Sequence, residues 1–206
     1  MSALTSIAAA TLPIVETFHS VQGEGAWMGC SAFFIRLAGC DVGCPWCDTK
    51  QSWPRDRHPE VAIADLVEAA VAAQPQFVVI TGGEPLLHDL TELTNALRSQ
   101  GLRCHLETSG SASPSGSFDW VTLSPKPFKA VVAANYNWAN ELKVVIQTDA
   151  DFDFAEQEAI AVPETTLKLL QPEWNSPESC DRVVNYVRQH PRWRVSLQTH
   201  KFLGVR

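Results

Sequence analysis

The sequence predicts an α/β fold in which helices cover a sheet or barrel of parallel strands. Two observations predict it. Short runs rich in Val, Ile, Leu and Phe alternate along the chain with windows of helical periodicity, in the order βαβα. A length of 206 residues, with 45% hydrophobic and 19% charged residues, is typical of one packed domain. We therefore expect a single domain over residues 1–206.

Eight strands are expected from short apolar runs, which are typical of buried strands. In chain order they cover residues 14–18, 32–37, 77–81, 102–107, 120–124, 141–146, 166–170 and 194–198.

Three helices are expected between these strands. Apolar residues at helical spacing give one face within residues 63–70, a second within 90–97 and a third within 183–187, the last beginning after Pro177. Because the carboxyl ends of parallel strands gather functional residues, we expect the site there.

The composition narrows the possible partners. The net charge is −7, so the chain has no global positive field that would attract nucleic acid. No apolar run approaches the ~20 residues that span a bilayer, and residues 7–10 lack the basic leader of a secretory signal. We expect a cytoplasmic protein with no nucleic-acid or membrane partner.

Three of the six cysteines lie in one short loop after the second predicted strand. Cys40, Cys44 and Cys47 have the spacing C-x3-C-x2-C. In a cytosolic chain such crowding favours a metal centre over disulfides. Iron-sulfur clusters are held by Cys thiolates, normally four. Three local thiolates would leave one iron open to a small molecule, so the loop predicts a cluster that binds a ligand.

The residues alone leave two other interpretations of these cysteines open. A zinc site with three Cys and one His would use His58, which follows Cys47 at a poor spacing for a compact zinc finger. Alternatively, Cys30 completes the cluster as a fourth ligand, and the protein is a non-catalytic iron-sulfur electron carrier.

A second motif lies at the end of a later strand. In Thr81-Gly82-Gly83-Glu84-Pro85 the two glycines let backbone carbonyls approach a ligand closely. Together with the cysteine loop, this turn resembles the radical S-adenosylmethionine enzymes. The resemblance implies a 4Fe-4S cluster whose open iron is chelated by S-adenosylmethionine, with the turn receiving the amino group of that cofactor.

Further segments make the chain similar to the 7-carboxy-7-deazaguanine synthases within that group, from about residue 15 to the last residue. They are Val21-Gln22-Gly23-Glu24-Gly25, Arg36-Leu37-Ala38-Gly39-Cys40, Cys47-Asp48-Thr49, Glu107-Thr108-Ser109-Gly110, Ser124-Pro125-Lys126, Glu141-Leu142-Lys143 and Gln198-Thr199-His200-Lys201. The resemblance implies an incomplete TIM-like (β/α)6 barrel with additional flanking strands.

The same resemblance implies which residues hold the cofactors. Cys40, Cys44 and Cys47 would bind the 4Fe-4S cluster, and the hydroxyl of Thr49 would bind Mg2+, which prefers oxygen ligands. The residues expected to contact S-adenosylmethionine are Trp46, Cys47, Asp48, Gly83, Ser124, Pro125, Lys126, Gln171, Pro172, Glu173 and Trp174.

The implied substrate is 6-carboxy-5,6,7,8-tetrahydropterin. A radical-mediated ring contraction would convert it to 7-carboxy-7-deazaguanine with loss of ammonia, a carbon-nitrogen lyase reaction of 7-deazapurine (queuosine) biosynthesis. Arg36 is expected to pair with the substrate carboxylate. For Arg206 we expect a contact through the main chain only. No side chain is assigned as a catalytic group, because the radical chemistry belongs to the cofactor. The residues expected to bind substrate are Val21, Gln22, Gly23, Glu24, Arg36, Thr81, Glu107 and Arg206.

The resemblance also implies a homodimer and a low-potential electron donor of the flavodoxin or ferredoxin type. One other enzyme class stays open. Glycyl-radical activating enzymes have a similar cysteine loop and Gly-Gly-Glu-Pro turn, but they give no purpose to Arg36 or Thr49.

Overall fold

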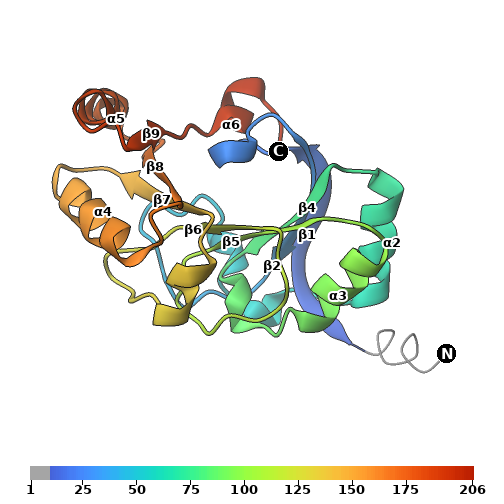
Figure 1. Cartoon of the computed structure of the whole chain (residues 1–206). Helices are drawn as coiled ribbons and strands as arrows, with labels where there is room; N and C mark the ends of the chain where they lie inside the picture. Colours follow the sequence, from blue (N-terminus) through green and yellow to red (C-terminus); the bar gives the residue numbers. More distant parts are fainter. Residues whose placement is uncertain (1–9) are drawn as a thin grey trace.

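The computed structural model describes residues 10–206, which form a nine-stranded sheet in the order β3-β1-β2-β4-β5-β6-β7-β8-β9. The run from β2 and β4 through β9 is parallel, whereas β1 pairs antiparallel with both β2 and β3. Figure 1 shows that the strands follow an open arc, so the predicted incomplete barrel is confirmed. The strands are β1 (Thr11–Val21), β2 (Ser31–Leu37), β3 (Glu60–Ala62), β4 (Phe77–Gly82), β5 (Cys104–Thr108), β6 (Trp120–Leu123), β7 (Glu141–Ile146), β8 (Leu167–Pro172) and β9 (Trp193–Val195).

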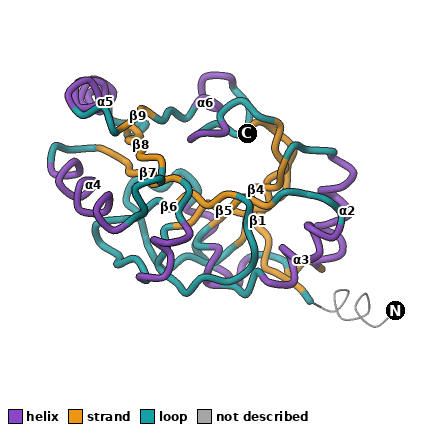
Figure 2. The backbone as a smooth tube through the Cα atoms, viewed as in Figure 1, coloured by secondary structure: helices purple, strands orange, loops and turns teal. Residues whose placement is uncertain are grey.

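Helices cover the outer face of the arc. In Figure 2, α2 and α3 lie beside the half that contains β1, β2 and β4, and α4 and α5 lie beside the half that contains β7 to β9. None of the helices in the described range is long and apolar enough to cross a membrane. The helices are α2 (Ile63–Ala73), α3 (Thr91–Ser99), α4 (Ala150–Ala161), α5 (Pro177–Gln189) and α6 (Thr199–Leu203).

In strand β7, successive side chains point alternately into the hydrophobic core and toward the inside of the arc. Leu142, Val144 and Ile146 are buried in a core that also contains residues of α4 and α5. Lys143 alternates with them and lines a cleft on the inner face. Polar groups on this face are therefore directed toward the inside of the arc.

Two connections between parallel strands contain no α-helix. The chain runs from β5 to β6 without one, and from β6 to β7 it forms only the 3-10 helix η5 (Ala133–Trp138). These connections are joined by Asn135, whose Nδ2 donates to the carbonyls of Gly110 (2.9 Å) and Ala112 (2.8 Å). A side chain of the second connection thus binds main-chain acceptors of the first and holds the two together.

The opening of the arc lies between the β9 edge and β1. Within residues 10–206 no strand ladder closes it, but η1 (Gly25–Trp27) and residues 196–206, which we call the closing segment, meet there (Figure 1). Thr199 donates to the carbonyl of Gly23 from both its main-chain nitrogen and its hydroxyl, each at 2.9 Å. The Oγ of Ser20 donates to the main-chain oxygen of Arg206 at 2.6 Å. Separate hydrogen bonds, rather than a strand ladder, therefore join the closing segment to β1 and the turn that follows it.

The eight predicted strands and three predicted helices are all present, with shifted ends except for β7. The prediction of a strand through 198 is wrong beyond Val195, because the chain leaves the sheet to begin the closing segment. Strand β3 and helices α4 and α6 were not predicted. The prediction made on residues 7–10 concerns positions that, except for residue 10, lie outside the described residues.

Candidate active site

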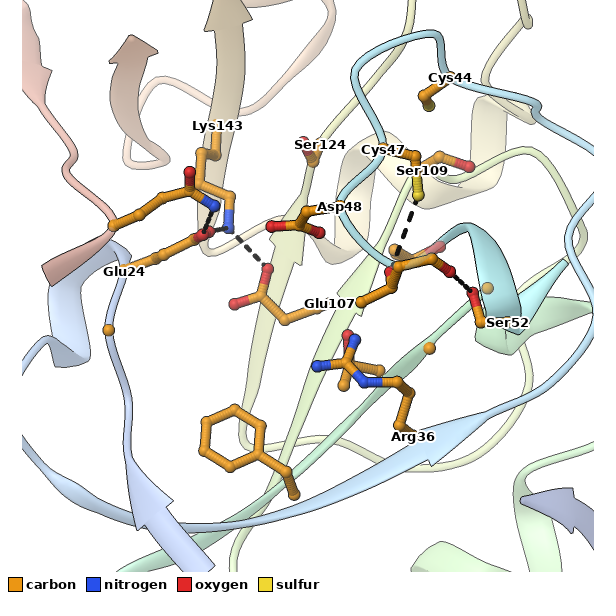
Figure 3. A pocket seen from close by; sticks show the side chains of 18 of the residues that line it. Glu24, Arg36, Cys44, Cys47, Asp48, Ser52, Glu107, Ser109, Ser124 and Lys143 are labelled. Atoms are coloured by element: carbon orange, nitrogen blue, oxygen red, sulfur yellow. Dashed lines mark hydrogen bonds and ion pairs between the residues drawn. The ribbon is translucent and has the colours of Figure 1, made fainter. Parts of the chain in front are cut away.

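The carboxyl ends of the parallel strands border a cleft of about 1200 Å³, a volume that includes its open mouth. A smaller cleft of about 630 Å³ adjoins this main cleft, and we call it the side cleft. Cys44, Cys47 and Lys126 are among the residues that line both. Every residue predicted for the site lines one or both clefts, except Pro125. The fold therefore gathers predicted site residues from residue 21 to residue 206 around these clefts. Figure 3 shows some of them from close by, among them Glu24, Arg36 and Cys47.

The cysteine loop forms one wall of the main cleft. Cys40, Cys44 and Cys47 all line it, and none is in a disulfide. The backbone fixes the loop, since Cys47 N donates to Cys44 O at 3.1 Å and Cys40 N donates to Trp53 O at 3.2 Å. Burial raises the pKa of the Cys44 thiol, and the neighbouring Cys47 and Cys40 add to this. Three crowded thiols of this kind are held as thiolates by a cationic centre, and the donor set fits a 4Fe-4S cluster.

The other interpretations of the cysteines find no support in the geometry. His58 Nε2 donates to the main-chain oxygen of Gln51 at 2.7 Å, and His58 lines neither cleft. Cys30 precedes β2 and Cys40 follows it, so a strand roughly 20 Å long separates the two residues. Among residues 10–206, no three His, Cys, Asp or Glu side chains are arranged around one metal-ion position. Thiolates of an iron-sulfur cluster bind different irons and need not converge in that way.

The backbone of the Gly-Gly-Glu-Pro turn is bonded to the end of β2 and to the start of the cysteine loop. Gly83 N donates to Leu37 O at 2.9 Å, and Glu84 N donates to Gly39 O at 2.8 Å. A Cβ on Gly83 would lie 2.1 Å from Gly39 O, and one on Gly82, whose φ is +141°, would lie 2.2 Å from Leu37 O. Only glycine allows the two motifs to approach this closely.

Glu84 ties together the ends of β4 and β5. Its buried carboxylate accepts hydrogen bonds from Thr108 Oγ1 at 2.5 Å and from the main-chain nitrogen and hydroxyl of Ser109 at 2.8 and 2.5 Å. It lines neither cleft. The carboxylate oxygens of Glu84 therefore hold the Gly-Gly-Glu-Pro turn against the end of β5.

Two guanidinium groups lie at one end of the main cleft. Arg36 Nε donates to Glu16 Oε1 at 2.9 Å, and Arg206 pairs with the other oxygen of Glu16. Both groups face the ring of Phe18, with Cζ 5.9 Å from its centroid for Arg36 and 5.1 Å for Arg206. The expected contact of Arg206 with substrate was assigned to its main chain only, but its side chain also lies at this end of the cleft. This end of the cleft is suited to an anionic ligand group.

A buried lysine and two carboxylates lie across the main cleft from Arg36 (Figure 3). Lys143 Nζ donates to Glu107 Oε2 at 2.8 Å and to Glu24 Oε2. Burial opposes ionisation of Glu24, but Lys143 lowers its pKa to about 2. Burial raises the pKa of Glu107 to about 7, and repulsion by Glu24 and Glu141 contributes to the rise. Sequence reasoning did not assign Lys143 to the site, although a lysine inside an apolar strand was an available signal.

The side cleft lies between the cysteine loop and the end of β8. Trp46 and Trp174 line it, and Lys201 of α6 reaches across it to Asp48 at 3.0 Å. Lys201 Nζ also lies 5.0 Å from the ring centroid of Trp174. Sequence reasoning did not assign Lys201 to the site, because its partners are distant in sequence. The closing segment thus borders both clefts.

Comparisons with known proteins agree with this arrangement. The model of the radical SAM superfamily matches residues 34–151. A 7-carboxy-7-deazaguanine synthase of Synechocystis sp. is 55% identical, covering 100% of this chain and 99% of the relative. One of Flavobacterium psychrophilum is 47% identical, covering 94% of this chain and 92% of the relative. The crystal structure of QueE from Escherichia coli is similar with a TM-score of 0.86 and 30% identity, covering 96% of this chain and 98% of that one.

Proposed function

The chain belongs to the radical SAM superfamily and, within it, to the family of the 7-carboxy-7-deazaguanine synthases, and from this membership we propose its reaction. It is a radical S-adenosylmethionine carbon-nitrogen lyase that converts 6-carboxy-5,6,7,8-tetrahydropterin to 7-carboxy-7-deazaguanine with loss of ammonia. The product enters 7-deazapurine (queuosine) biosynthesis. The observation that carries the proposal is that the cysteine loop, the Gly82-Gly83 turn and the polar interior of the arc border one cleft.

In this proposal the protein holds and orients the reactants. Cys40, Cys44 and Cys47 hold the 4Fe-4S cluster, and the side cleft and the Gly-Gly-Glu-Pro turn take S-adenosylmethionine. When bound, these cofactors supply the radical that abstracts a hydrogen atom from the substrate. The backbone bonds of Gly83 to the end of β2 and of Glu84 to the start of the cysteine loop keep the two cofactor sites at a fixed spacing. Fixed spacing matters because an unselective radical must form within contact of its target C–H bond.

The two ends of the main cleft match the two ends of the carboxypterin. Its carboxylate fits the cationic end, where Glu16 Oε1 accepts from Arg36 Nε and leaves the terminal nitrogens of the guanidinium on the cleft side. Its aminopyrimidinone edge, which carries N–H donors, fits the carboxylates of Glu24 and Glu107. A glycyl-radical activating enzyme acts on a protein backbone and would not need such a polarised cleft.

Thr49 is the proposed protein ligand of Mg2+. It follows the cysteine loop and lines the main cleft, with Oγ1 3.7 Å from Cys47 Sγ. A single hydroxyl suits Mg2+, which completes its shell with water and substrate oxygens. Bound there, the ion would neutralise the substrate carboxylate. We expect Thr49→Ala to weaken the dependence of product formation on Mg2+ while the iron content is unchanged. An Mg2+ titration identical to that of wild type would remove Thr49 from the metal site.

The reaction is tested with anaerobically reconstituted protein. The mixture contains a reductant, S-adenosylmethionine, Mg2+ and the carboxypterin, and 7-carboxy-7-deazaguanine is detected by mass spectrometry. Cys47→Ala should abolish S-adenosylmethionine cleavage and product formation. Absence of product from wild-type protein with a fully loaded cluster would refute the substrate assignment.

The proposal also includes partners that rest on the family resemblance. They are a low-potential donor of the flavodoxin or ferredoxin type and a second copy of this chain in a homodimer. We place the reaction in the cytoplasm. Light scattering of the reconstituted protein tests the dimer, and reduction by each purified donor tests the electron source.

A further inference from the structure

Lys143 is a charged residue in an otherwise apolar strand. Its neighbours Leu142 and Val144 are buried in the core, and Lys143 itself is only 4% exposed. An ammonium group is costly to remove from water unless acceptors surround it. A lysine at this position therefore needs dedicated partners.

The partners come from two distant segments. Nζ donates to Oε2 of Glu107 at the end of β5 (2.8 Å) and to Oε2 of Glu24 in the turn after β1 (Figure 3). The other oxygen of each carboxylate accepts from an amide. Gln22 Nε2 donates to Glu107 at 3.2 Å, and Gln198 Nε2 donates to Glu24 at 2.9 Å. One lysine thus fixes the directions of two carboxylates that line the main cleft.

Negative charge exceeds positive charge around this lysine. Glu141 lies on the same face of β7, but its oxygens accept from Ala26 N and Thr122 Oγ1, both at 2.9 Å. One ammonium group therefore faces two cleft-lining carboxylates. The lowered pKa of Glu24 and the raised pKa of Glu107 agree with a charge balance that is incomplete. Hydrogen-bond donors from a ligand would complete it.

We propose that Lys143 is a positioning residue that holds Glu107 and Glu24 as a rigid pair of acceptors for one edge of a fused-ring heterocycle, where a ring N–H lies beside an exocyclic amino group. The inference rests on the proposed function, because the carboxypterin has such an edge. Carboxylates that are already oriented need not be ordered when the ligand binds, which favours affinity. Buried acceptors also reject a ligand that lacks the matching donor.

The test compares Lys143→Met and Lys143→Arg with wild type in the reconstituted holoenzyme. Equilibrium dialysis gives the Kd of the carboxypterin and of an analogue in which an oxo group replaces the 2-amino group. We expect Lys143→Met to raise the Kd of the carboxypterin by about 10- to 100-fold, the range for losing charge-assisted hydrogen bonds. Its preference for the carboxypterin over the analogue should fall. Formation of 5′-deoxyadenosine without substrate should fall less than substrate binding does, because Lys143 donates to Glu24 and Glu107 and not to the cysteine loop.

Lys168→Met is the matched control, because Lys168 lies on β8 and lines neither cleft. Lys143→Arg keeps the positive charge that the folded protein needs. Its planar guanidinium changes the directions of both carboxylates, so this variant too should lose preference for the carboxypterin.

The dependence of the Kd on pH separates a positioning role from a purely structural one. Substrate binding should tighten as Glu107 ionises, and Lys143→Met should shift this midpoint upward. The charged groups facing Glu107 are Lys143 and Glu141 on β7, Glu24 after β1 and Lys126 after β6.

Unchanged Kd and unchanged preference in both Lys143 variants would overturn the inference. Equal losses of substrate binding, substrate-free cofactor cleavage and thermal stability in both variants would overturn it as well, because they indicate a structural role. Failure of the proposed function looks different. In that case wild type would cleave S-adenosylmethionine but neither bind nor convert the carboxypterin.

Discussion

Glu16 organises the cationic end of the cleft with a single carboxylate. Its pair with Arg36 is shielded, since the side chains of Arg36 and Glu16 are 18% and 19% exposed. Shielded pairs of this kind contribute more than exposed ones. Within residues 10–206, Nε is the only atom of the Arg36 side chain that makes a hydrogen bond. Glu16 therefore sets the direction in which the terminal nitrogens of Arg36 face the cleft (Figure 3).

We expect Glu16→Gln to raise the KM of the carboxypterin about tenfold, because the guanidinium loses a charge-assisted partner that orients it. Substrate-free formation of 5′-deoxyadenosine should not change. Glu60→Gln is the control, since Glu60 belongs to an exposed pair with Arg55. Steady-state kinetics with equal KM values in Glu16→Gln and wild type would contradict the assignment.

Glu107 links protonation to stability. Its pKa in the folded protein, about 7, lies above the ordinary value of 4.5, so between these pH values the folded state keeps a proton that the unfolded state has lost. The contribution of Glu107 to the free energy of unfolding is full below pH 4.5 and is lost as pH rises through 7. Glu107→Gln removes this loss. Its stability relative to wild type should therefore rise between pH 4.5 and 7, by on the order of 3 kcal/mol, and then level off.

The comparison with wild type is needed because the contribution of a buried histidine to the free energy of unfolding changes with pH in the opposite direction. Burial lowers the pKa of His105 to about 4, so its contribution grows as pH rises from 4 toward 6.5. Both proteins share this term and it cancels in the difference. Urea unfolding at several pH values gives the measurement. A difference that is flat from pH 5 to pH 8 would show that Glu107 has an ordinary pKa.

At the scale of elements, β4 and the cysteine loop meet through a contact that excludes any side chain. Gly83→Ala would place a Cβ 2.1 Å from Gly39 O, which is backbone and cannot move aside cheaply. We expect a loss of about 3 kcal/mol or more in the free energy of unfolding and a lower iron content after reconstitution. Gly29→Ala is the control, because Gly29 has φ +87° and no atom within 4 Å of the added Cβ. It should cost only about 1 kcal/mol from backbone strain. Similar losses in both variants would contradict this account.

Elements with a clear apolar pattern could be predicted from the sequence, and elements without one could not. Residues 141–146 were predicted with the observed bounds because their outward side chains are all aliphatic. Helix α4 has no continuous apolar stripe, since only Phe152, Ala155 and Ala159 are buried and acidic residues lie between them. Helix α6 is too short to show a period. Its position depends on Gly23, which is far away in sequence.

In the candidate site too, only residues that belong to a local sequence pattern could be predicted. Motif residues such as Cys40 and Gly83 could be predicted because their chemistry is local. Lys143 could not be assigned a role, because its partner Glu24 is 119 positions away and only the fold brings them together. Arg206 was assigned to the site by its main chain, yet the side chain also reaches Glu16. Contacts between distant segments need the register of the sheet, which periodicity does not supply.

At the scale of the whole molecule, the closing segment completes the cleft while burying little of itself. Phe202, Leu203 and Val205 are exposed, so removal of the segment takes little apolar surface out of the core. We expect deletion of residues 199–206 to lower Tm by only about 2 to 4 °C, the effect of roughly 1 kcal/mol in a chain of this size. The Kd of the carboxypterin should rise at least tenfold, because Gln198 and Arg206 contacts at the cleft are disturbed or lost. Differential scanning calorimetry and equilibrium dialysis measure the two effects. A large fall in Tm, or unchanged binding, would contradict the assignment.

The arc is closed by weaker contacts between β9 and β1 than between any two neighbouring strands of the sheet. Everywhere from β3 to β9 neighbouring strands share ladders, whereas the span from β9 back to β1 is held by a handful of separate contacts, among them Thr199 with Gly23 and Ser20 with Arg206. Breaking those contacts leaves every strand pair intact. We therefore expect this stretch, rather than any strand pair, to be the place where the cleft opens to admit a bulky heterocycle.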